Sequence, residues 1–524
     1  MLKIVNIRLP LNYTKEELYK KACDFLRVES VNSLVLDCRE TVKKENEIYY
    51  KATLLVSLDE KQEEKLALVM RKKGVTRVSV LPYTQKRCES KLRPVVVGFG
   101  PAGIFSALVL AMAGLRPIVL ERGKKAEERN RDVERLKTLG ILDPESNIQF
   151  GEGGAGAFSD GKLKIGLKDS RRRFILSSLV EAGADESILY LEKAHVGSDI
   201  LHKVIVNLRK KIESLGGEII FGARFEKPIM KSGKVVGALY TKDGKSEELI
   251  TDSIVLATGH SARDTFYSLY NEGVKMEQKG FGIGVRIEHP QSLINELEYK
   301  GLADLGAADY KMVTHLKNSR SLYTFCMCPG GYVVPATSEE KGICTNGMSE
   351  FRRDGENANT ALLVSVFPSD FPSDHALAGI ELQREIEKKA YALSSSYKAP
   401  VIRLEDFLSH RESTSFGGVK PSYKPGTIFA SPDQYLPDYV CESLRLGLID
   451  MGDYKKGYLY PDAILTGPEA RTTSPVKILR ENYEAIGFEG LFPAGEGAGY
   501  AGGIISASLD GMLTAEAILD KKSQ

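Results

Sequence analysis

The fold of this 524-residue chain is decided by the stretch R-P-V-V-V-G-F-G-P-A-G-I-F-S-A-L-V-L-A-M-A-G-L-R-P-I-V-L-E-R-G, residues 93–123. Its pattern predicts a buried strand over 94–97, a tight glycine turn, a helix over 102–113 and a second strand over 117–120. A β-branched strand, a glycine turn and an apolar helix in this order are typical of a parallel βαβ unit. The sequence therefore predicts an α/β core.

The glycine turn has the G-x-G-x-x-G spacing of a dinucleotide-binding unit. Gly98 permits the tight turn, Gly100 lets backbone amides approach a pyrophosphate, and Gly103 brings the helix close to the sheet. The pyrophosphate would lie at the helix N-terminus, where free N–H groups favour an anion. Glu121, at the end of the second strand, can accept a hydrogen bond from a ribose hydroxyl. The expected contacts of this unit are Gly98, Gly100, Pro101, Ala102, Gly103, Glu121 and Arg122.

The composition is that of an ordinary soluble globular protein, with 42% hydrophobic and 27% charged residues. A net charge of +2 gives no global attraction to nucleic acid or anionic membranes. Seven scattered cysteines indicate no disulfide framework and favour a reducing cytoplasm. A membrane span is the alternative for 95–120, but glycines, prolines and Arg116 interrupt that run, and a span needs about 20 consecutive apolar residues. We therefore expect a cytoplasmic protein with no membrane partner.

Residues 1–86 precede this unit and predict a small domain of their own. Thr14 and Glu17 form a capping box that begins a helix, and a second helix covers 61–72. The expected strands are 3–9, 33–39, 48–58 and 77–81. The order β-α-β-β-α-β is typical of the split βαβ, ferredoxin-like unit. We interpret it as a packing or oligomerisation module, with docking or RNA contact as alternatives.

A second glycine-rich stretch, F-G-E-G-G-A-G-A-F-S-D-G-K-L, covers residues 150–163. Such an amide-rich loop can wrap a phosphate or lie flat against a flavin ring. The alternative is a flexible surface loop, but the flanking Phe150 and Phe158 favour cofactor contact. The expected contacts are Gly151, Gly153, Gly154, Gly156 and Ser159.

The stretch that follows reads as the second half of a dinucleotide-binding flavoprotein core. A helix over 200–215 leads to strands over 218–221, 234–240 and 253–257, and the last strand ends in A-T-G. A strand end that passes close to a cofactor needs residues without bulk. The expected contacts there are Thr258 and Gly259.

The chain returns to this core at its end. Strands are expected over 476–479 and 490–493, followed by the turn G-E-G-A-G-Y-A-G-G-I at 495–504 and a helix over 504–519. A helix N-terminus at the N1–C2=O edge of a flavin stabilises the negative charge of the reduced ring. This third element favours FAD over NAD as the bound cofactor. The expected contacts are Gly495, Glu496, Gly502, Gly503 and Ile504.

The predicted fold is α/β, a Rossmann-like FAD-binding core with an inserted α+β substrate or cap domain and an N-terminal ferredoxin-like domain. The stretch between the two parts of the core has no second G-x-G-x-x-G motif, so we assign it to the cap. The expected boundaries are 1–86 for the ferredoxin-like domain, 87–264 for the first part of the core, 265–470 for the cap domain and 471–524 for the C-terminal part of the core.

Several motifs together resemble the bacterial family of uncharacterised FAD-dependent dehydrogenases. That family belongs to the flavoprotein class typified by fumarate reductase and the flavin-dependent tRNA-uridine-modifying enzymes. The chain departs from the family loop at Ala157, where threonine is expected. The resemblance implies non-covalent FAD in a Rossmann-like core and a redox reaction without an assigned substrate. The motifs are G-F-G-P-A-G at 98–103, the loop at 150–163, F-C-M-C-P-G-G at 325–331, A-R-T-T-S-P at 470–475 and G-L-F-P-A-G-E-G-A-G-Y-A-G-G-I at 490–504.

Candidate catalytic residues lie outside the glycine turns. Cys326 and Cys328 form a C-x-C pair that would face one side of a regular strand. They either exchange electrons with the flavin or are two buried structural thiols. A metal site is not predicted, because the sequence has no matching second pair of ligands. Arg286 is a candidate clamp for a carboxylate, and His289 a candidate proton donor near neutral pH. The alternative for Arg286 is a structural salt bridge, and the alternative for His289 is a surface histidine. Arg471 is likewise either a candidate catalytic residue or a structural one.

The leading hypothesis is an FAD-dependent oxidoreductase that acts on a small organic substrate by hydride transfer through non-covalent FAD. NAD(P)H, if it is the electron donor, would bind transiently, because no second nucleotide fingerprint is present. An RNA-modifying flavoenzyme is one alternative, although the near-neutral charge argues against nucleic acid. A flavin-binding electron-transfer or sensor protein is the other, and it predicts no enclosed cavity. The leading hypothesis requires that the turns at Gly98, Gly151 and Gly495 converge on one adenine–flavin molecule.

Overall fold

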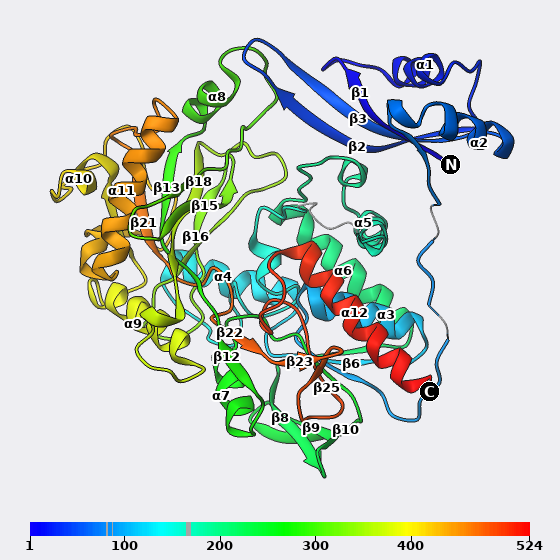
Figure 1. Cartoon of the computed structure of the whole chain (residues 1–524). Coiled ribbons are helices and arrows are strands. Elements are labelled where there is room, and N and C mark those ends of the chain that lie inside the picture. The colour runs from blue at the N-terminus through cyan, green and yellow to red at the C-terminus, as the bar shows by residue number, and fades with distance from the viewer. Residues whose placement is uncertain (80–81, 86, 164–168, 524) are drawn as a thin grey trace.

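The structure is a computed structural model that describes residues 1–79, 82–85, 87–163 and 169–523 (Figure 1). An N-terminal unit has its own sheet and contacts the rest of the chain, for example where the Arg39 N–H donates to the Tyr190 carbonyl oxygen at 2.6 Å and where Lys43 pairs with Glu298 at 2.9 Å. The remainder divides into a core around a parallel sheet and a second part around a larger, mostly antiparallel sheet.

A five-stranded parallel sheet is the centre of the core. Its three central strands are completely buried and rich in β-branched residues, as expected for a parallel sheet covered on both faces. The strand from the C-terminal end of the chain pairs with β11, so the predicted return of the chain to the core is confirmed. In spatial order the strands are β25 (Leu491–Pro493), β11 (Ile254–Leu256), β5 (Val95–Val97), β6 (Ile118–Glu121) and β7 (Glu218–Phe221).

The helix of the predicted βαβ unit is α3 (Pro101–Met112), and it is buried nearly all round. The C-terminal helix α12 (Ile504–Lys522) packs along it, as Figure 1 shows. A Cβ added at Gly511 would lie 2.1 Å from the Ala102 carbonyl oxygen, so this close packing requires glycine. Burial in the core explains the apolar composition of 95–120. Among the described residues, no helix is both long and apolar enough to cross a membrane.

The remaining elements of the core lie between these strands in sequence. Helices α4 (Ala126–Leu139), α5 (Arg171–Glu181) and α6 (Ser198–Ser214) follow β6. A three-stranded antiparallel meander then leads into β11, and α7 (Arg263–Asn271) follows that strand. The meander consists of β8 (Ala223–Lys231), β9 (Lys234–Lys242) and β10 (Lys245–Ile250).

The second part, which we call the cap, is built on a seven-stranded sheet. The helices of the cap are α8 (Gln291–Tyr299), α9 (Ala378–Ala392), α10 (Leu404–Leu408) and α11 (Asp438–Tyr454). In spatial order the strands are β14 (Val313–His315), β15 (Ser321–Cys328), β18 (Asn357–Val366), β13 (Phe281–Pro290), β21 (Ile464–Glu469), β19 (Ala399–Arg403) and β20 (Thr427–Phe429).

Three small strand pairs complete the cap and the core. One pair lies where the chain passes between core and cap. There β12 (Met276–Gln278), which leads into the cap, pairs antiparallel with β22 (Val476–Ile478), which leads back to the core. The others are β16 (Tyr332–Pro335) with β17 (Thr345–Met348) and β23 (Arg480–Glu481) with β24 (Glu484–Ala485).

The N-terminal unit has the element order and the sheet order β2-β3-β1-β4 of a split βαβ fold. The predicted capping box is confirmed, since Thr14 and Glu17 exchange side-chain to backbone hydrogen bonds at the start of α1. The predicted strand over 77–81 is replaced by one that ends at Arg77, and residues 80 and 81 lie outside the described chain. The elements are β1 (Leu2–Leu9), α1 (Lys15–Leu26), β2 (Ser33–Lys43), β3 (Ile48–Ser57), α2 (Glu60–Val69) and β4 (Val75–Arg77).

Candidate active site between the core and the cap

The three glycine-rich turns meet near the carboxyl ends of the parallel strands. They are separated by up to some four hundred residues of sequence, yet they pack so closely that an added Cβ at several of their glycines would meet a neighbouring turn or the helix that follows it. The contacts are these: a Cβ added at Gly154 would lie 3.0 Å from the Gly100 Cα, one at Gly156 would lie 3.6 Å from the Ile504 side chain, and one at Gly495 would lie 2.7 Å from the Ala102 Cβ.

The first turn leaves space at the N-terminus of α3. Gly98 has φ +95°, and a Cβ there would lie 2.4 Å from the Ala257 carbonyl oxygen. A Cβ at Gly103 would lie 2.0 Å from the Gly98 carbonyl oxygen. At Gly100, in contrast, the nearest atom to an added Cβ is 3.8 Å away. The fold therefore requires glycine at 98 and 103, whereas glycine at 100 keeps open the position where an anion would meet the helix N-terminus.

Glu121 ties the first two turns together. Its Oε2 accepts a hydrogen bond from the Phe99 N–H at 2.8 Å. Its Oε1 accepts from the N–H groups of Gly123 and Gly151, each at 2.9 Å. A carboxylate has about four lone-pair positions, so one acceptor position remains, on Oε2. That position can serve a ribose hydroxyl, and the buried carboxylate also holds the protein's own backbone.

The second turn is fixed by Arg129, a residue that the sequence did not single out. Its guanidinium is fully buried on α4, where burial lowers its pKa to about 10. It also lies over the Phe158 ring, 4.8 Å from the centroid. It donates to the carbonyl oxygens of Asn147 at 2.8 Å, Ile148 at 2.9 Å, Glu152 at 2.7 Å and Gly154 at 2.8 Å.

The far end of this loop is joined to the cap. The buried Asp160 carboxylate accepts from Arg353 Nε at 2.9 Å and from Arg353 Nη2 at 2.5 Å. The Ser159 hydroxyl donates to the Gly156 carbonyl at 2.8 Å and accepts from the Gly161 N–H at 3.1 Å. Ser159 therefore shapes the loop with its side chain. The loop is held at both ends and is not a free surface segment.

The third turn exposes the N-terminus of α12. Additional Cβ atoms at Gly502 and Gly503 would meet nothing within 4 Å, so the backbone there faces open space. The Gly495 N–H is already used, because it donates to Asp510 Oδ2 at 2.7 Å. Gly495 thus serves the close approach to α3, and the open amides for an anion or a ring edge lie at Gly502 and Gly503.

The A-T-G strand end also reaches this region. Gly259 has φ +68° and open space at its Cβ position, and a Cβ at Gly497 would lie 2.3 Å from its carbonyl oxygen. Thr258 immediately precedes it at the end of β11. Arg122 lies over the Phe150 ring, 4.2 Å from the centroid, and its guanidinium is paired with Glu145 and Asp264 at 2.8 Å each. Open glycines, one carboxylate acceptor and two helix N-termini in one place fit a bound FAD.

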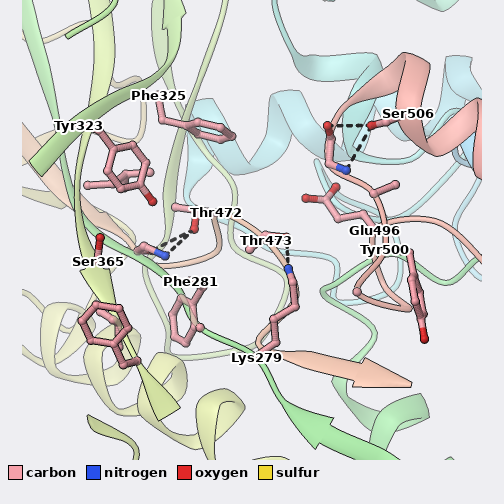
Figure 2. A pocket seen from close by; sticks show the side chains of 18 residues that line it. Lys279, Phe281, Tyr323, Phe325, Ser365, Thr472, Thr473, Glu496, Tyr500 and Ser506 are labelled. Carbon is pink, nitrogen blue, oxygen red and sulfur yellow. Dashed lines mark hydrogen bonds between the residues drawn. The ribbon is translucent and has the colours of Figure 1, made fainter. Parts of the chain in front are cut away.

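A groove of 710 Å³ lies beside the third turn, between core and cap (Figure 2). Phe281, Tyr323 and Phe325 line it from the cap, and Tyr500 from the core. Polar groups lie among these rings, including the hydroxyls of Thr472, Thr473 and Ser506. An apolar groove with a few convergent polar groups is the usual form of a small-molecule site.

Lys279 and Glu496 are the charged side chains that line the groove. Burial lowers the pKa of Lys279, and its ammonium group donates to Thr473 Oγ1 at 3.3 Å. Burial raises the pKa of Glu496 to about 7, although the Lys279 charge opposes this. In Figure 2 the Glu496 carboxylate points from the core turn toward the cap side of the groove. We expected Glu496 as a cofactor contact, and the structure presents it to the groove.

The two cysteines of the C-x-C motif do not lie on a regular strand. The pairing of β15 with β18 shifts between Phe325 and Cys328, which is a β-bulge, and Cys326 has φ +45°. The expectation that both thiols face one side by simple alternation was therefore wrong. Cys326 is half-buried and Cys328 is fully buried, and neither forms a disulfide.

Arg286 lies beneath this bulge and is fully buried. Its Nη1 is 2.8 Å from Glu469 Oε2, its Nε donates to Asn359 Oδ1 at 2.8 Å, and its Nη2 donates to the Cys326 carbonyl oxygen at 2.6 Å. Burial raises the pKa of Glu469 to about 7 even beside this arginine. All three ends of the guanidinium are engaged by protein groups, so Arg286 positions the bulge and does not line the groove.

His289 is a core residue of the cap. The alternative of a surface histidine is wrong, because β13 continues through Pro290 and the ring is completely buried. Its Nε2 lies 2.8 Å from the Tyr458 carbonyl oxygen, and the two rings are 4.9 Å apart. Burial lowers its pKa to about 4, so the ring is neutral at physiological pH. It is not among the groove-lining residues.

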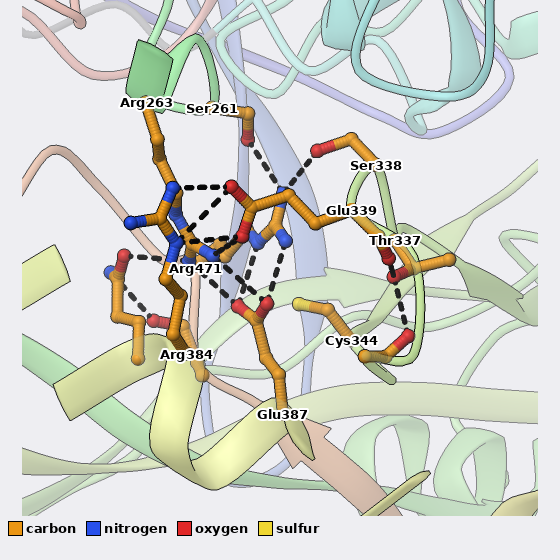
Figure 3. Close-up of polar contacts among 12 residues, drawn as sticks. Ser261, Arg263, Thr337, Ser338, Glu339, Cys344, Arg384, Glu387 and Arg471 are labelled. Carbon is orange, nitrogen blue, oxygen red and sulfur yellow. Dashed lines mark hydrogen bonds and ion pairs between the residues drawn. The ribbon is translucent and has the colours of Figure 1, made fainter. Parts of the chain in front are cut away.

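Arg471 belongs to a buried ion cluster between core and cap (Figure 3). Its Nε and Nη2 donate to Glu387 at 2.7 and 2.6 Å. Arg263 of α7 donates to the same carboxylate at 2.8 Å and to Glu339 at 2.6 Å, and Arg384 also pairs with Glu339. Burial would raise the pKa of Glu387, but Arg263 and Arg471 hold it below the ordinary value. Arg471 thus joins the two parts of the chain.

Four groups that shape the site were missed from sequence: Arg129, Lys279, Glu469 and the groove-facing role of Glu496. Arg129 stands in a helix rich in charged residues, where nothing in the sequence separates it from its neighbours. The E-A-R and K-x-F patterns around Glu469 and Lys279 carry no recognised spacing. Among the described residues, no group of three or more His, Cys, Asp or Glu side chains is arranged to hold a metal.

Known proteins resemble this chain at two levels. A family model described as "FAD-dependent protein, C-terminal domain-like" matches residues 280–472. An uncharacterized protein of Clostridium beijerinckii is 46% identical over 532 aligned positions, which cover 99% of each chain.

Solved structures resemble the chain more loosely. A geranylgeranyl bacteriochlorophyll reductase-like protein from Thermoplasma acidophilum is 14% identical, with 82% of this chain and 79% of that chain covered and a TM-score of 0.37. A flavoprotein/dehydrogenase from Cytophaga hutchinsonii is 11% identical, with 83% and 80% covered and a TM-score of 0.36.

The clostridial relative matches nearly the whole of this chain at 46% identity, and the FAD-dependent model covers the cap from β13 through β21. Both findings agree with the convergence of the three glycine turns and with the motifs quoted from the sequence. The chain therefore belongs, with its clostridial relative, to an uncharacterised family of FAD-dependent proteins.

Proposed function

We propose that this protein transfers a hydride between non-covalent FAD and a small organic anion with an aromatic or unsaturated body, bound in the groove between core and cap. The observation that carries the proposal is the meeting of three glycine turns beside that groove. Gly502 supports it directly, because it has open space at its backbone and also lines the groove. The cofactor site and the groove therefore share one wall.

The residues named above would hold the FAD. Gly100 and the N-terminus of α3 would face the pyrophosphate, Glu121 Oε2 a ribose hydroxyl, and the N-terminus of α12 the ring edge. When bound, the flavin supplies the two-electron chemistry. The protein contributes the arrangement of these groups and the walls that limit access of water to the groove.

The walls of the groove determine the proposed substrate class. Phe281, Tyr323 and Phe325 offer flat apolar surfaces on one side, which suit an aromatic or conjugated ring. Lys279 is the cation of the groove lining, and its half-buried ammonium would pair with a carboxylate. A groove of this volume favours a substrate over the alternative of an electron carrier without a pocket.

Glu496 is the proposed proton donor and acceptor. Hydride transfer to an unsaturated carbon must be accompanied by a proton on the neighbouring atom, and the reverse reaction must remove it. With a pKa of about 7, Glu496 holds a mixture of both protonation states near neutral pH. A group with a pKa near the operating pH is the most effective general acid or base.

The test is an anaerobic titration of the FAD-loaded protein. We expect a yellow protein with absorption near ~450 nm, bleached by dithionite and by NADH or NADPH as a transient donor. Small aromatic and unsaturated carboxylates should perturb the flavin spectrum, and Lys279→Ala should weaken that effect about tenfold or more. Lys234→Ala, on the distant meander, is the matched control. A colourless protein that takes up no added FAD would overturn the proposal.

A further inference from the structure

The C-x-C bulge presents two thiols in unequal environments next to the groove. Phe325, which precedes the pair, lines the groove and is 45% exposed. Cys326 follows it in a left-handed conformation at φ +45°, which residues other than glycine adopt uncommonly. The Cys328 side chain is fully buried behind it. Cys326 therefore keeps some exposed surface beside the groove-lining Phe325, whereas Cys328 has none.

Hydrogen bonds fix this arrangement from below. Arg286 Nη2 donates to the Cys326 carbonyl oxygen at 2.6 Å and lies 3.8 Å from the Cys328 sulfur. The Cys328 thiol lies 3.2 Å from the same carbonyl oxygen. Gly347 makes room for the arginine, since a Cβ there would lie 2.4 Å from Arg286 Nη2. A buried guanidinium thus holds the peptide between the two thiols.

The protonation of the pair is also unequal. The hydrogen bond from Cys328 lowers the pKa of Cys326 to about 6, with Lys162 and Arg286 acting in the same direction. The same interaction, together with burial, raises the pKa of Cys328 well above its ordinary value. Both shifts favour ionisation of Cys326 before Cys328. This is the division of roles between an attacking and a resolving cysteine.

We propose that Cys326 and Cys328 form a dithiol site that reduces a small-molecule disulfide by thiol–disulfide exchange. The site is independent of the hydride transfer proposed above, since the two thiols themselves supply the electrons.

Atoms and electrons balance in two steps. The Cys326 thiolate attacks one sulfur of R–S–S–R, the S–S bond breaks, and one RS⁻ leaves and takes a proton from water. Cys328 then attacks the Cys326 sulfur of the mixed disulfide, and its own proton goes to the second departing RS⁻. The products are two RSH molecules and a Cys326–Cys328 disulfide. The substrate gains two electrons and the cysteine pair loses two.

The experiment uses the full-length, FAD-loaded protein with glutathione disulfide or cystine as the probe. Intact mass and thiol titration are the readouts. We expect the wild-type protein to lose two thiols and about 2 Da without a lasting adduct. Cys328→Ser should accumulate one covalent glutathione, mapped to Cys326, whereas Cys326→Ser should acquire none at this motif. Cys38→Ser, which removes a half-buried cysteine of the N-terminal unit, is the matched control and should behave as wild type.

Two results would overturn the inference. One is a wild-type protein that keeps both thiols under excess disulfide. The other is a pair that is oxidised by hydrogen peroxide only, with a sulfenic acid in Cys328→Ser and no glutathione adduct. Where a variant does not fold, peptide mapping of the wild-type protein after treatment with glutathione disulfide decides: a Cys326–Cys328 disulfide supports the inference, and two free thiols overturn it. None of these readouts depends on flavin reduction, so failure here leaves the hydride-transfer proposal untouched.

Discussion

Glu121 Oε1 accepts a hydrogen bond from the Gly151 N–H at 2.9 Å, although the two residues belong to different glycine turns. A Cβ at Gly123, the next glycine along, would lie 2.4 Å from the Gly151 nitrogen, so the two backbones are as close as they can be. An acidic residue at the end of β6 is usually discussed as a ligand of the ribose. Here the same carboxylate also holds the backbones of two glycine turns together.

Glu121→Gln should therefore destabilise the protein even without FAD. The amide offers one oxygen where the carboxylate offers two, and its NH₂ group would face a backbone N–H. Leaving a buried donor without an acceptor costs roughly 1–3 kcal/mol. Urea unfolding of the apoprotein should show that loss, with Glu127→Gln on the surface of α4 as the control. Equal stability of Glu121→Gln and wild-type apoprotein would restrict the role of Glu121 to the cofactor.

Substitutions of the first turn should separate stability from cofactor binding. Gly103→Ala places a methyl group 2.0 Å from the Gly98 carbonyl, so the apoprotein should lose about 1–3 kcal/mol. Gly100→Ala meets its nearest atom at 3.8 Å and should leave the apoprotein unchanged. It should nevertheless weaken FAD binding about tenfold or more, because the methyl group occupies the place of the anion.

Thermal unfolding of the apoprotein and equilibrium titration with FAD give both quantities for each variant. If Gly100→Ala binds FAD as tightly as wild type, the pyrophosphate does not lie at the N-terminus of α3.

The core could be predicted from sequence because its signals are local. The helix expected over 102–113 is α3 (Pro101–Met112), and the helix expected over 504–519 is α12 (Ile504–Lys522). Glycine turns, caps and β-branched runs define these elements within a few residues of the chain. The sheet of the cap could not be derived in the same way. β13 and β18 are almost completely buried, so their sequences lack the alternation of apolar and polar residues that marks a strand. The sequence alone does not distinguish such a strand from a buried helix.

The candidate site was predictable where it consists of glycines and not where it depends on tertiary partners. The bulge at Cys326 exists because Arg286, forty residues earlier, donates to its carbonyl oxygen. His289 is hydrogen-bonded to and covered by Tyr458, which is far away in sequence. The pKa of Glu496 is set by burial against the cap. None of these partners leaves a spacing in the sequence.

The ion cluster between core and cap should contribute strongly to stability. Glu387→Gln leaves Arg263 and Arg471 buried with half of their acceptors, and removing one partner of a buried pair costs about 3–5 kcal/mol. Glu385→Gln, which removes an exposed partner of Lys389 on the same helix, should cost less than about 1 kcal/mol. Urea unfolding of both variants is the measurement. Equal losses would show that the cluster does not join the two parts of the chain.

The stability of the protein should fall in mild acid because buried histidines must gain protons on unfolding. Burial lowers the pKa of His289 to about 4 from the ordinary 6.5. Its contribution is therefore fully present above pH 6.5 and is lost as the pH falls toward 4, with a limit of about 3 kcal/mol for this group. His289→Phe should lose the hydrogen bond to Tyr458, which costs roughly 1–3 kcal/mol at pH 7. Its unfolding free energy should then change less between pH 6.5 and 4 than that of wild type, whereas His315→Gln, at an exposed position, should keep the wild-type slope. A His289→Phe slope as steep as that of wild type would mean that the ring is already protonated in the folded protein.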